Sequence, residues 1–243
     1  MKIKMIGTGA ISSKKRSACC LIDDKILIDC GNGIVKTLLE QNVDINKIDT
    51  LLITHLHGDH FLDIPFLILQ RKFCSANNEL KIYCPIGTEK IIGKIIRLIY
   101  SDIKDWTILR DKTKVEFVEF EELKEKEVSA SYFVTSYNVI HGDFSPAFGY
   151  IINYKDKAIG ISGDSTYCDN IEKIVQNSDI SILDMSFIES SDKHMGVNDI
   201  EFLSKKFNKN IIPTHMSDSA RNYAIEQKID NIIILNDGDS IEI

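Results

Sequence analysis

A short segment near residue 55 carries a high density of metal-ligating side chains. Four of them lie within six residues: His55, His57, Asp59 and His60. Two histidines at alternate positions of an extended loop can point together, and the turn that Gly58 permits can direct the other two side chains at a second ion. Imidazole and carboxylate ligands suit zinc, manganese or iron(II). A solvated histidine-rich loop is the alternative, but it gives no reason to crowd three histidines beside an apolar helix. The segment therefore predicts a metal centre.

Three further residues of ligand type each follow a predicted strand: His141 in VIHGD, Asp164 in ISGDST and His215 in PTHMSD. Each has an ordinary alternative when it is considered alone. A single histidine after a strand is more often a satisfied polar residue, and Asp164 could cap a turn or a helix. Because the loops that follow strands converge in space, the joint pattern favours one shared centre.

The elements that must position these residues change in type along the chain. Strands and helices alternate up to about residue 100, strands dominate the middle, and alternation resumes in the last third. This order suggests two sheets packed face to face, with helices outside them. Strands are expected at 2–6, 18–22, 25–29, 50–54, 80–84, 114–120, 129–140, 148–154, 157–162, 180–185, 210–214, 231–235 and 240–243, and helices at 33–41, 61–73, 89–100, 170–178, 197–207 and 219–228.

The H-x-H-x-D-H pattern of residues 55–60, with the three later residues in order, resembles the signature of the metallo-β-lactamase superfamily. The resemblance implies an α/β fold, a four-layer αββα sandwich with metals at one edge of the sheets, formed by residues 1–243 as one domain. It also implies two divalent ions, zinc or alternatively manganese or iron(II). By this resemblance one ion is held by His55, His57 and His141, the other by Asp59, His60 and His215, and both by the bridging carboxylate of Asp164.

The resemblance also implies a chemistry. Two ions can share a bridging hydroxide that attacks the substrate, and they stabilise the negative charge that develops. Asp59 can position this nucleophile or accept its proton. Asp29, in ILIDCGNG, matches an acidic residue of the superfamily that would orient a ligating histidine. A turn residue before Gly31 is an equal alternative for Asp29.

His194 is the candidate for the acid that protonates the leaving group. It lies in a polar loop, 21 residues before His215. A lone histidine more often lies on the protein surface without a function. However, this chain resembles the ribonuclease Z family, which has a catalytic histidine in a loop at about this place. The resemblance extends over most of the chain, through MKIKMIGTGA, LIDCGNG, KIDTLLITHLHGDHFLDIPFLI, ISGDST and PTHMSDSAR.

Departures from ribonuclease Z limit what the resemblance implies. Only 22 residues separate His141 from Asp164, enough for two strands and not for the long arm with which that family grips tRNA. The family's HEAT segment reads LDMS at 183–186, so Asp184 replaces the glutamate that would support His194. Lys14, Lys15 and Arg16 form only a short basic run, which is usually solvated surface.

We therefore expect a binuclear metal-dependent phosphodiesterase of ribonuclease Z-like type, acting on a small molecule or an RNA. Three alternatives stay open: a tRNA 3′-processing endonuclease, a hydrolase of a small ester, lactone or thioester, and a non-catalytic sensor of a metal or ligand. Cleavage of a tRNA precursor would identify the first. The complete ligand set and His194 argue against the sensor. A homodimer is compatible with the resemblance, although no sequence feature shows it.

Composition and charge restrict the setting of this activity. The net charge of −7 and the pI of about 5.4 argue against a protein that works mainly through a basic, nucleic-acid-binding face. The six cysteines include no C-x-x-C pair, which favours reduced, mostly buried thiols. The opening residues lack the apolar core of a signal peptide, and no stretch is long enough for a membrane span. A cytoplasmic, soluble protein is expected.

Overall fold

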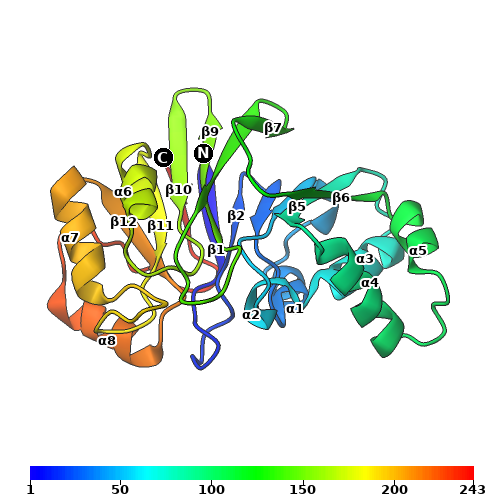
Figure 1. Ribbon diagram of the computed structural model, residues 1–243, viewed down its shortest axis with the longest axis horizontal. Helices are drawn as coiled ribbons and strands as arrows, with labels where there is room; N and C mark the ends of the chain where they lie inside the picture. Colours follow the sequence, from blue (N-terminus) through cyan, green and yellow to red (C-terminus); the bar gives the residue numbers. More distant parts are fainter.

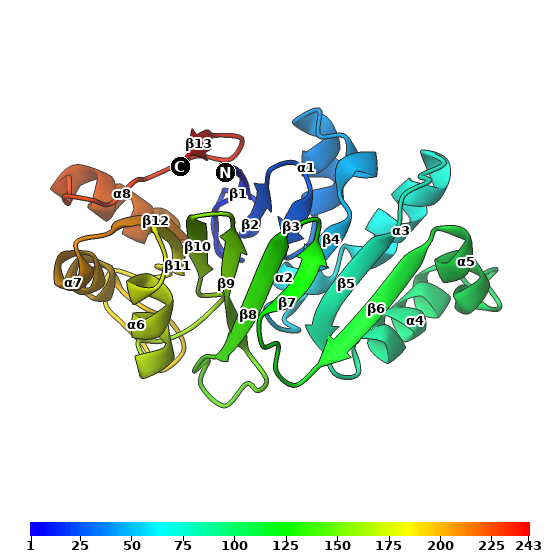
Figure 2. The ribbon, with the colours of Figure 1, turned by 90° about the horizontal axis from the view of Figure 1, so that it is seen from above.

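Two sheets face each other at the centre of the molecule. The structure is a computed structural model that describes residues 1–243. The first sheet has the strand order β13-β1-β2-β3-β4-β5-β6 and the second β12-β11-β10-β9-β8-β7. Figure 2 shows α1, α3, α4 and α5 along the outer face of the first sheet and α6, α7 and α8 along that of the second. This arrangement is the αββα sandwich expected from the sequence.

The elements have the following bounds. The strands are β1 (Lys2–Gly7), β2 (Cys19–Ile22), β3 (Ile26–Ile28), β4 (Thr50–Leu52), β5 (Leu80–Pro85), β6 (Val115–Phe120), β7 (Lys126–Ser129), β8 (Tyr132–Asn138), β9 (Phe148–Tyr154), β10 (Lys157–Ile161), β11 (Ile180–Asp184), β12 (Asn210–Thr214) and β13 (Ser240–Glu242). The helices are α1 (Ile34–Glu40), α2 (Gly58–Phe61), α3 (Ile64–Phe73), α4 (Thr88–Ile99), α5 (Trp106–Lys112), α6 (Asp169–Gln176), α7 (Val197–Phe207) and α8 (Asp218–Gln227), with a 3₁₀ turn at Ile45–Lys47 (Figure 1).

Separate apolar clusters fill the three interfaces between these layers. Strand β9 shows how one strand serves two of them. Its residues Phe148, Tyr150 and Ile152 pack between the sheets, whereas Ile151 packs on the opposite face, in the cluster beneath α6 and α7. Alternate side chains of a strand point to opposite faces, so a strand that is covered on both sides is apolar throughout. No helix combines the length and the apolar character needed to cross a bilayer.

The topology brings the loops that carry the candidate ligands to one edge. Strands β3, β4, β5 and β6 are mutually parallel, and so are β10, β11 and β12. The segment 55–60 follows β4, and His141, Asp164 and His215 follow β8, β10 and β12. Loops that leave the carboxyl ends of such strands meet at one edge, where α/β sheets commonly bind ligands.

The sequence-based expectations differ from the structure at several elements. The single strand expected at 129–140 covers the end of β7, a turn and the antiparallel strand β8, and the helix expected at 61–73 is divided into α2 and α3. Helix α5 was not expected, although Asp105 caps it by accepting a hydrogen bond from the backbone N–H of Thr107 at 3.0 Å. The strand expected at 231–235 is wrong, because only an isolated bridge joins Ile232 to Ile211. This segment leaves the edge of β12 to reach β13 beside β1, so it cannot stay paired with either sheet.

Candidate metal centre

Three imidazoles form the first group of candidate ligands. The Nε2 atoms of His55 and His141 each lie 3.0 Å from Nδ1 of His57. The other nitrogen of His55 is 3.0 Å from the Thr54 hydroxyl, and Nδ1 of His141 donates to the carbonyl oxygen of Lys193 at 3.0 Å. Because the outer nitrogens of His55 and His141 already have partners, their inner nitrogens are left to converge with Nδ1 of His57 on a common point. This is how three neutral histidines present lone pairs to a cation.

The second group comprises Asp59, His60 and His215. Nε2 of His215 lies 3.3 Å from Oδ2 of Asp59, and Nε2 of His60 lies 3.8 Å from the same oxygen. The candidate ligand atoms of this group all lie within 4.8 Å of one another, as do those of the first group. Residues 59 and 60 belong to α2, whereas His215 follows β12, so the group joins distant parts of the chain.

Asp164 lies between the two groups. Its Oδ1 is 3.3 Å from Nε2 of His60, and its Oδ2 is 3.4 Å from Nε2 of His215 and 3.9 Å from Nε2 of His55. One buried carboxylate therefore contacts both groups. Burial opposes its negative charge, but His215 and His60 outweigh that effect and hold the pKa of Asp164 well below its ordinary value.

The donor set fits divalent cations. Nε2 of His60 is buried, and its contact with Oδ1 of Asp164 at 3.3 Å lacks the geometry of a hydrogen bond, an arrangement that costs free energy unless another ligand satisfies the nitrogen. Although burial disfavours the protonated imidazole, Asp164 and Asp29 raise the pKa of His60 well above its ordinary value. A cation coordinated by nitrogen and carboxylate oxygen would satisfy both His60 and Asp164, and zinc, manganese and iron(II) accept such ligands.

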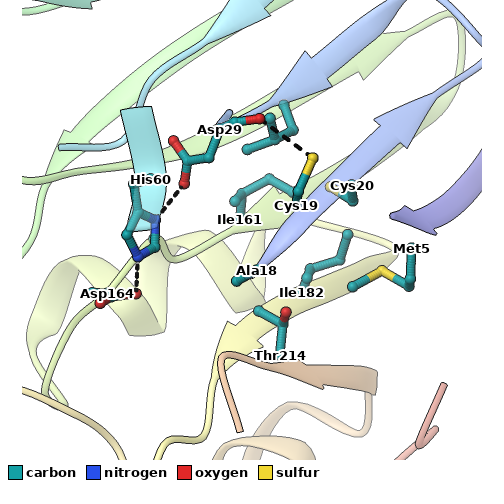
Figure 3. A pocket seen from close by; sticks show the side chains of 12 residues that line it. Met5, Ala18, Cys19, Cys20, Asp29, His60, Ile161, Asp164, Ile182 and Thr214 are labelled. Carbon is teal, nitrogen blue, oxygen red and sulfur yellow. Dashed lines mark hydrogen bonds and ion pairs between the residues drawn. The ribbon is translucent and has the colours of Figure 1, made fainter. Parts of the chain in front are cut away.

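Asp29 contacts the His60 ring at Nδ1, the nitrogen opposite the candidate ligand atom. Its Oδ2 lies 2.8 Å from Nδ1 of His60, and its carboxylate also accepts hydrogen bonds of 2.8 Å from the backbone N–H and the hydroxyl of Thr54. Figure 3 shows Asp29 and Asp164 on opposite sides of the His60 ring. They line one wall of a cavity of about 30 Å³ that Cys19, Cys20 and other residues close. The contact favours the expected orienting role over that of a turn residue.

Gly31 allows this support to approach closely. A Cβ atom at this position would lie 1.7 Å from the carbonyl oxygen of Asp59. The neighbouring Cys30 N–H donates to the carbonyl oxygen of His60 at 2.7 Å. Any side chain at position 31 would push α2 away, so the glycine fixes the distance between Asp29 and His60.

His194 lies beside the second group and is held by two residues. Its Nδ1 is 2.7 Å from Oδ2 of Asp184 and 3.0 Å from the hydroxyl oxygen of Ser186. That hydroxyl donates to Oδ1 of Asp184 at 2.6 Å and lies 2.8 Å from Nδ1 of His215. Since a hydroxyl has one proton, Ser186 must accept from His215, which leaves Nε2 of His215 as the free lone pair. The carboxylate of Asp184 therefore reaches His194 despite being shorter than glutamate.

All ten residues singled out from the sequence lie in this one centre. Thr54 and Ser186 were missed, because single hydroxyl residues carry no spacing signal. Thr54 precedes the first ligand directly, and Ser186 closes the LDMS segment, so adjacency was the only available cue. Between His141 and Asp164 the chain forms β9 and β10 with a short turn, so no arm is inserted there.

Comparison with solved structures supports the same fold. The metallo-β-lactamase fold protein YhfI from Bacillus subtilis aligns with a TM-score of 0.78 at 17% identity and covers 99% of each chain. The short form of human tRNase Z aligns with a TM-score of 0.74 at 20% identity, over 100% of this chain and 99% of the other. These similarities show the αββα metallo-β-lactamase fold.

Sequence relatives point to the same superfamily. A ribonuclease Z of Listeria monocytogenes serotype 4a (strain HCC23) is 26% identical over 79% of this chain and 64% of its own length. One from Methanocaldococcus jannaschii is 40% identical over 40% of this chain and 32% of its own. The chain thus spans less than two thirds of the length of these relatives. They confirm the resemblance to ribonuclease Z-like members of the superfamily and support its assignment to metal-dependent hydrolases.

A family model gives the most specific assignment. It describes the Anti-Pycsar protein Apyc1 family and matches residues 1–239, nearly the whole chain. The matched range includes every candidate ligand as well as Asp29, Asp184 and His194. This protein belongs to the Anti-Pycsar protein Apyc1 family and has the metallo-β-lactamase fold.

Proposed function

We propose that this protein is a binuclear metal-dependent phosphodiesterase. The main support is that Asp164 contacts both ligand groups. In addition, His194 is held by Asp184, and its Nδ1 lies 4.0 Å from Oδ2 of Asp164. Seven ligands and an oriented histidine supply what hydrolysis of a diester needs. Because ligands come from both halves of the chain, residues 1–243 would act as one domain.

The protein side chains would divide the work as follows. Bound divalent ions would activate water and stabilise the negative charge that develops on phosphoryl oxygens. Asp59, which is 3.3 Å from His215, would accept the proton of the attacking water. His194 would give a proton to the leaving oxygen, and Asp184 would hold the ring in place. Asp29, through His60, would fix the second ligand group.

We infer a small diester rather than tRNA as the substrate. Strands β9 and β10 occupy most of the segment between His141 and Asp164, so this segment contains no arm for gripping RNA. The net charge of −7 adds no broad electrostatic attraction to a polyanion. The names of the curated relatives nevertheless keep tRNA 3′ processing as the second candidate, and the two differ in their products.

A substrate panel tests the proposal. Purified protein loaded with zinc or manganese is expected to hydrolyse bis(p-nitrophenyl) phosphate and nucleoside cyclic phosphates. The variant His194→Ala should keep its metal content and lose turnover. Cleavage of a lactone or thioester with no diester turnover under any divalent metal would overturn the proposal. Specific cutting of a tRNA precursor after its acceptor stem would favour the second candidate.

A further inference from the structure

Four side chains on the buried side of the metal centre form a continuous chain of contacts from one ligand group to the other. Nδ1 of His55 lies 3.0 Å from the hydroxyl oxygen of Thr54, and this oxygen lies 2.8 Å from Oδ2 of Asp29. The same Oδ2 lies 2.8 Å from Nδ1 of His60. All four residues are buried. Since His55 belongs to the first group and His60 to the second, the chain joins both.

The direction of each hydrogen bond in this chain follows from the protons that each group carries. A carboxylate only accepts hydrogen bonds, so Asp29 accepts from the hydroxyl of Thr54 and from Nδ1–H of His60. A hydroxyl has one proton, and because Thr54 donates it to Asp29, its oxygen can only accept from His55. Nδ1 of His55 therefore carries the proton of the neutral ring, and Nε2 keeps its lone pair for a cation.

The backbone and the packing around Thr54 hold this arrangement in place. The N–H of Thr54 donates to Oδ1 of Asp29 at 2.8 Å, and its carbonyl oxygen accepts from the N–H of Phe148 at 2.9 Å. Gly163 packs so closely that a Cβ atom there would lie 2.9 Å from Cβ of Thr54. Asp29 has a left-handed backbone with a φ of 61°, a conformation that aspartate adopts only where its contacts stabilise it. The hydroxyl is thus kept between the carboxylate and His55.

We propose that Thr54 is a positioning residue that relays the negative charge of Asp29 to His55, so that one carboxylate sets the tautomer of a ligand in each group. This inference rests on the proposed function, because it concerns the centre that would hold the ions. Asp29 acts on His60 directly and on His55 only through the hydroxyl. Thr54 would not be a ligand itself. Its effect is to keep Nε2 of His55 unprotonated before a metal binds.

The relay predicts an effect that a purely structural role for Thr54 does not. In Asp29→Asn, one carboxylate oxygen becomes an NH2 group, which can only donate. The backbone N–H of Thr54 cannot change its role, so the amide oxygen should face it and the NH2 group should face the hydroxyl. Thr54 must then accept from the amide and donate to Nδ1 of His55, which moves the ring proton to Nε2. Asp29 makes no hydrogen bond to His55, so this effect has to pass through Thr54.

Nitrogen NMR of the histidine rings tests the inference without relying on turnover. The protein has six histidines, few enough for each ring to be assigned. In chelator-treated protein at about pH 8, where an ordinary imidazole is neutral, His55 should be protonated at Nδ1 in the wild type and in Thr54→Ser, which keeps the hydroxyl. In Thr54→Val, which keeps the shape, and in Asp29→Asn the proton should move to Nε2. The zinc affinity of Thr54→Val, measured by competition against a chelating indicator, should fall about 10- to 100-fold.

A matched variant controls for the loss of a buried hydroxyl nearby in the chain. Thr50 is buried on β4, and its hydroxyl contacts Oδ1 of Asp49 at 2.9 Å and the carbonyl oxygen of Val128 at 3.1 Å, away from the ligands. Thr50→Val should therefore keep the wild-type tautomer of His55 and the wild-type zinc affinity.

Three results would overturn the inference. The first is a wild-type His55 that is protonated at Nε2, which needs no variant to detect. The second is an Asp29→Asn protein whose His55 keeps its proton at Nδ1, and the third is an equal zinc affinity of Thr54→Val and Thr50→Val. If the tautomers respond as expected and the zinc-loaded wild type hydrolyses no diester, the proposed function fails while the relay stands.

Discussion

The carboxylate of Asp184 accepts a hydrogen bond of 2.7 Å from Nδ1 of His194, which leaves Nε2 as the nitrogen that can face a substrate. Asp184 is buried and its other oxygen accepts from Ser186, so its negative charge is held next to the imidazole. Such a contact fixes the orientation of the ring. Asp184 and Ser186 thereby hold His194 in the orientation that the proposed general acid requires.

The first prediction concerns this contact. Asp184→Asn keeps the shape and removes the charge, so kcat for a diester with an alcohol leaving group should fall about 10- to 100-fold. The fall should be smaller with p-nitrophenolate, which leaves without a proton. Asp184→Glu should recover part of the loss, and Asp192→Asn, in the same loop, should behave as wild type. Equal losses for both leaving groups would contradict a role through acid catalysis.

The second prediction concerns the support of the second ligand group. Replacing Asp29 with Asn removes a charge that lies 2.8 Å from His60, so metal affinity should fall about 10- to 100-fold. Competition against a chelating indicator measures this affinity. Asp24→Asn, in the turn between β2 and β3, is the matched control and should not change it. An unaltered affinity in the Asp29 variant would show that the carboxylate is only a turn residue.

The third prediction concerns protons released when the metal binds. The pKa values of His60 and His215 are raised despite burial, chiefly by Asp164, so the protonated form of each ring is favoured before metal binds. Because a metal needs the neutral imidazole, binding must release these protons, and apparent affinity should rise with pH. Calorimetry in two non-coordinating buffers of different ionisation enthalpy should give different heats. Identical heats and a pH-independent affinity would disagree with this assignment of charge.

The fourth prediction concerns stability. A ligand that binds only the folded state stabilises it by about 2.7 kcal/mol at 100 times its Kd. Zinc should therefore raise the Tm of chelator-treated protein, and His60→Ala should show a much smaller rise. If zinc shifted the two proteins equally, the stabilising site would have to lie elsewhere.

The layers and the metal centre could largely be predicted from the sequence. Alternating apolar patterns mark strands such as β9, and the ligands stand out because histidine and aspartate are crowded at 55–60 and then recur after strands. The element that was wrong, 231–235, has a strand-like composition. Its backbone crosses from one sheet to the other, however, and only the tertiary structure reveals that crossing.

The residues that hold the ligands were harder to predict. Ser186 and Thr54 act through a single hydroxyl each, and serine and threonine are too common for their presence to mean anything alone. Contacts between segments far apart in the chain carry this information, and a spacing pattern does not contain it.

Metal titration of turnover tests the central claim most directly. Protein stripped with a chelator is supplied with increasing equivalents of zinc or manganese, and hydrolysis of bis(p-nitrophenyl) phosphate is followed together with bound metal. The proposed centre predicts no turnover without metal and a rise that levels off when two ions are bound per chain. Turnover that survives complete removal of metal, or none at any metal content, would contradict it.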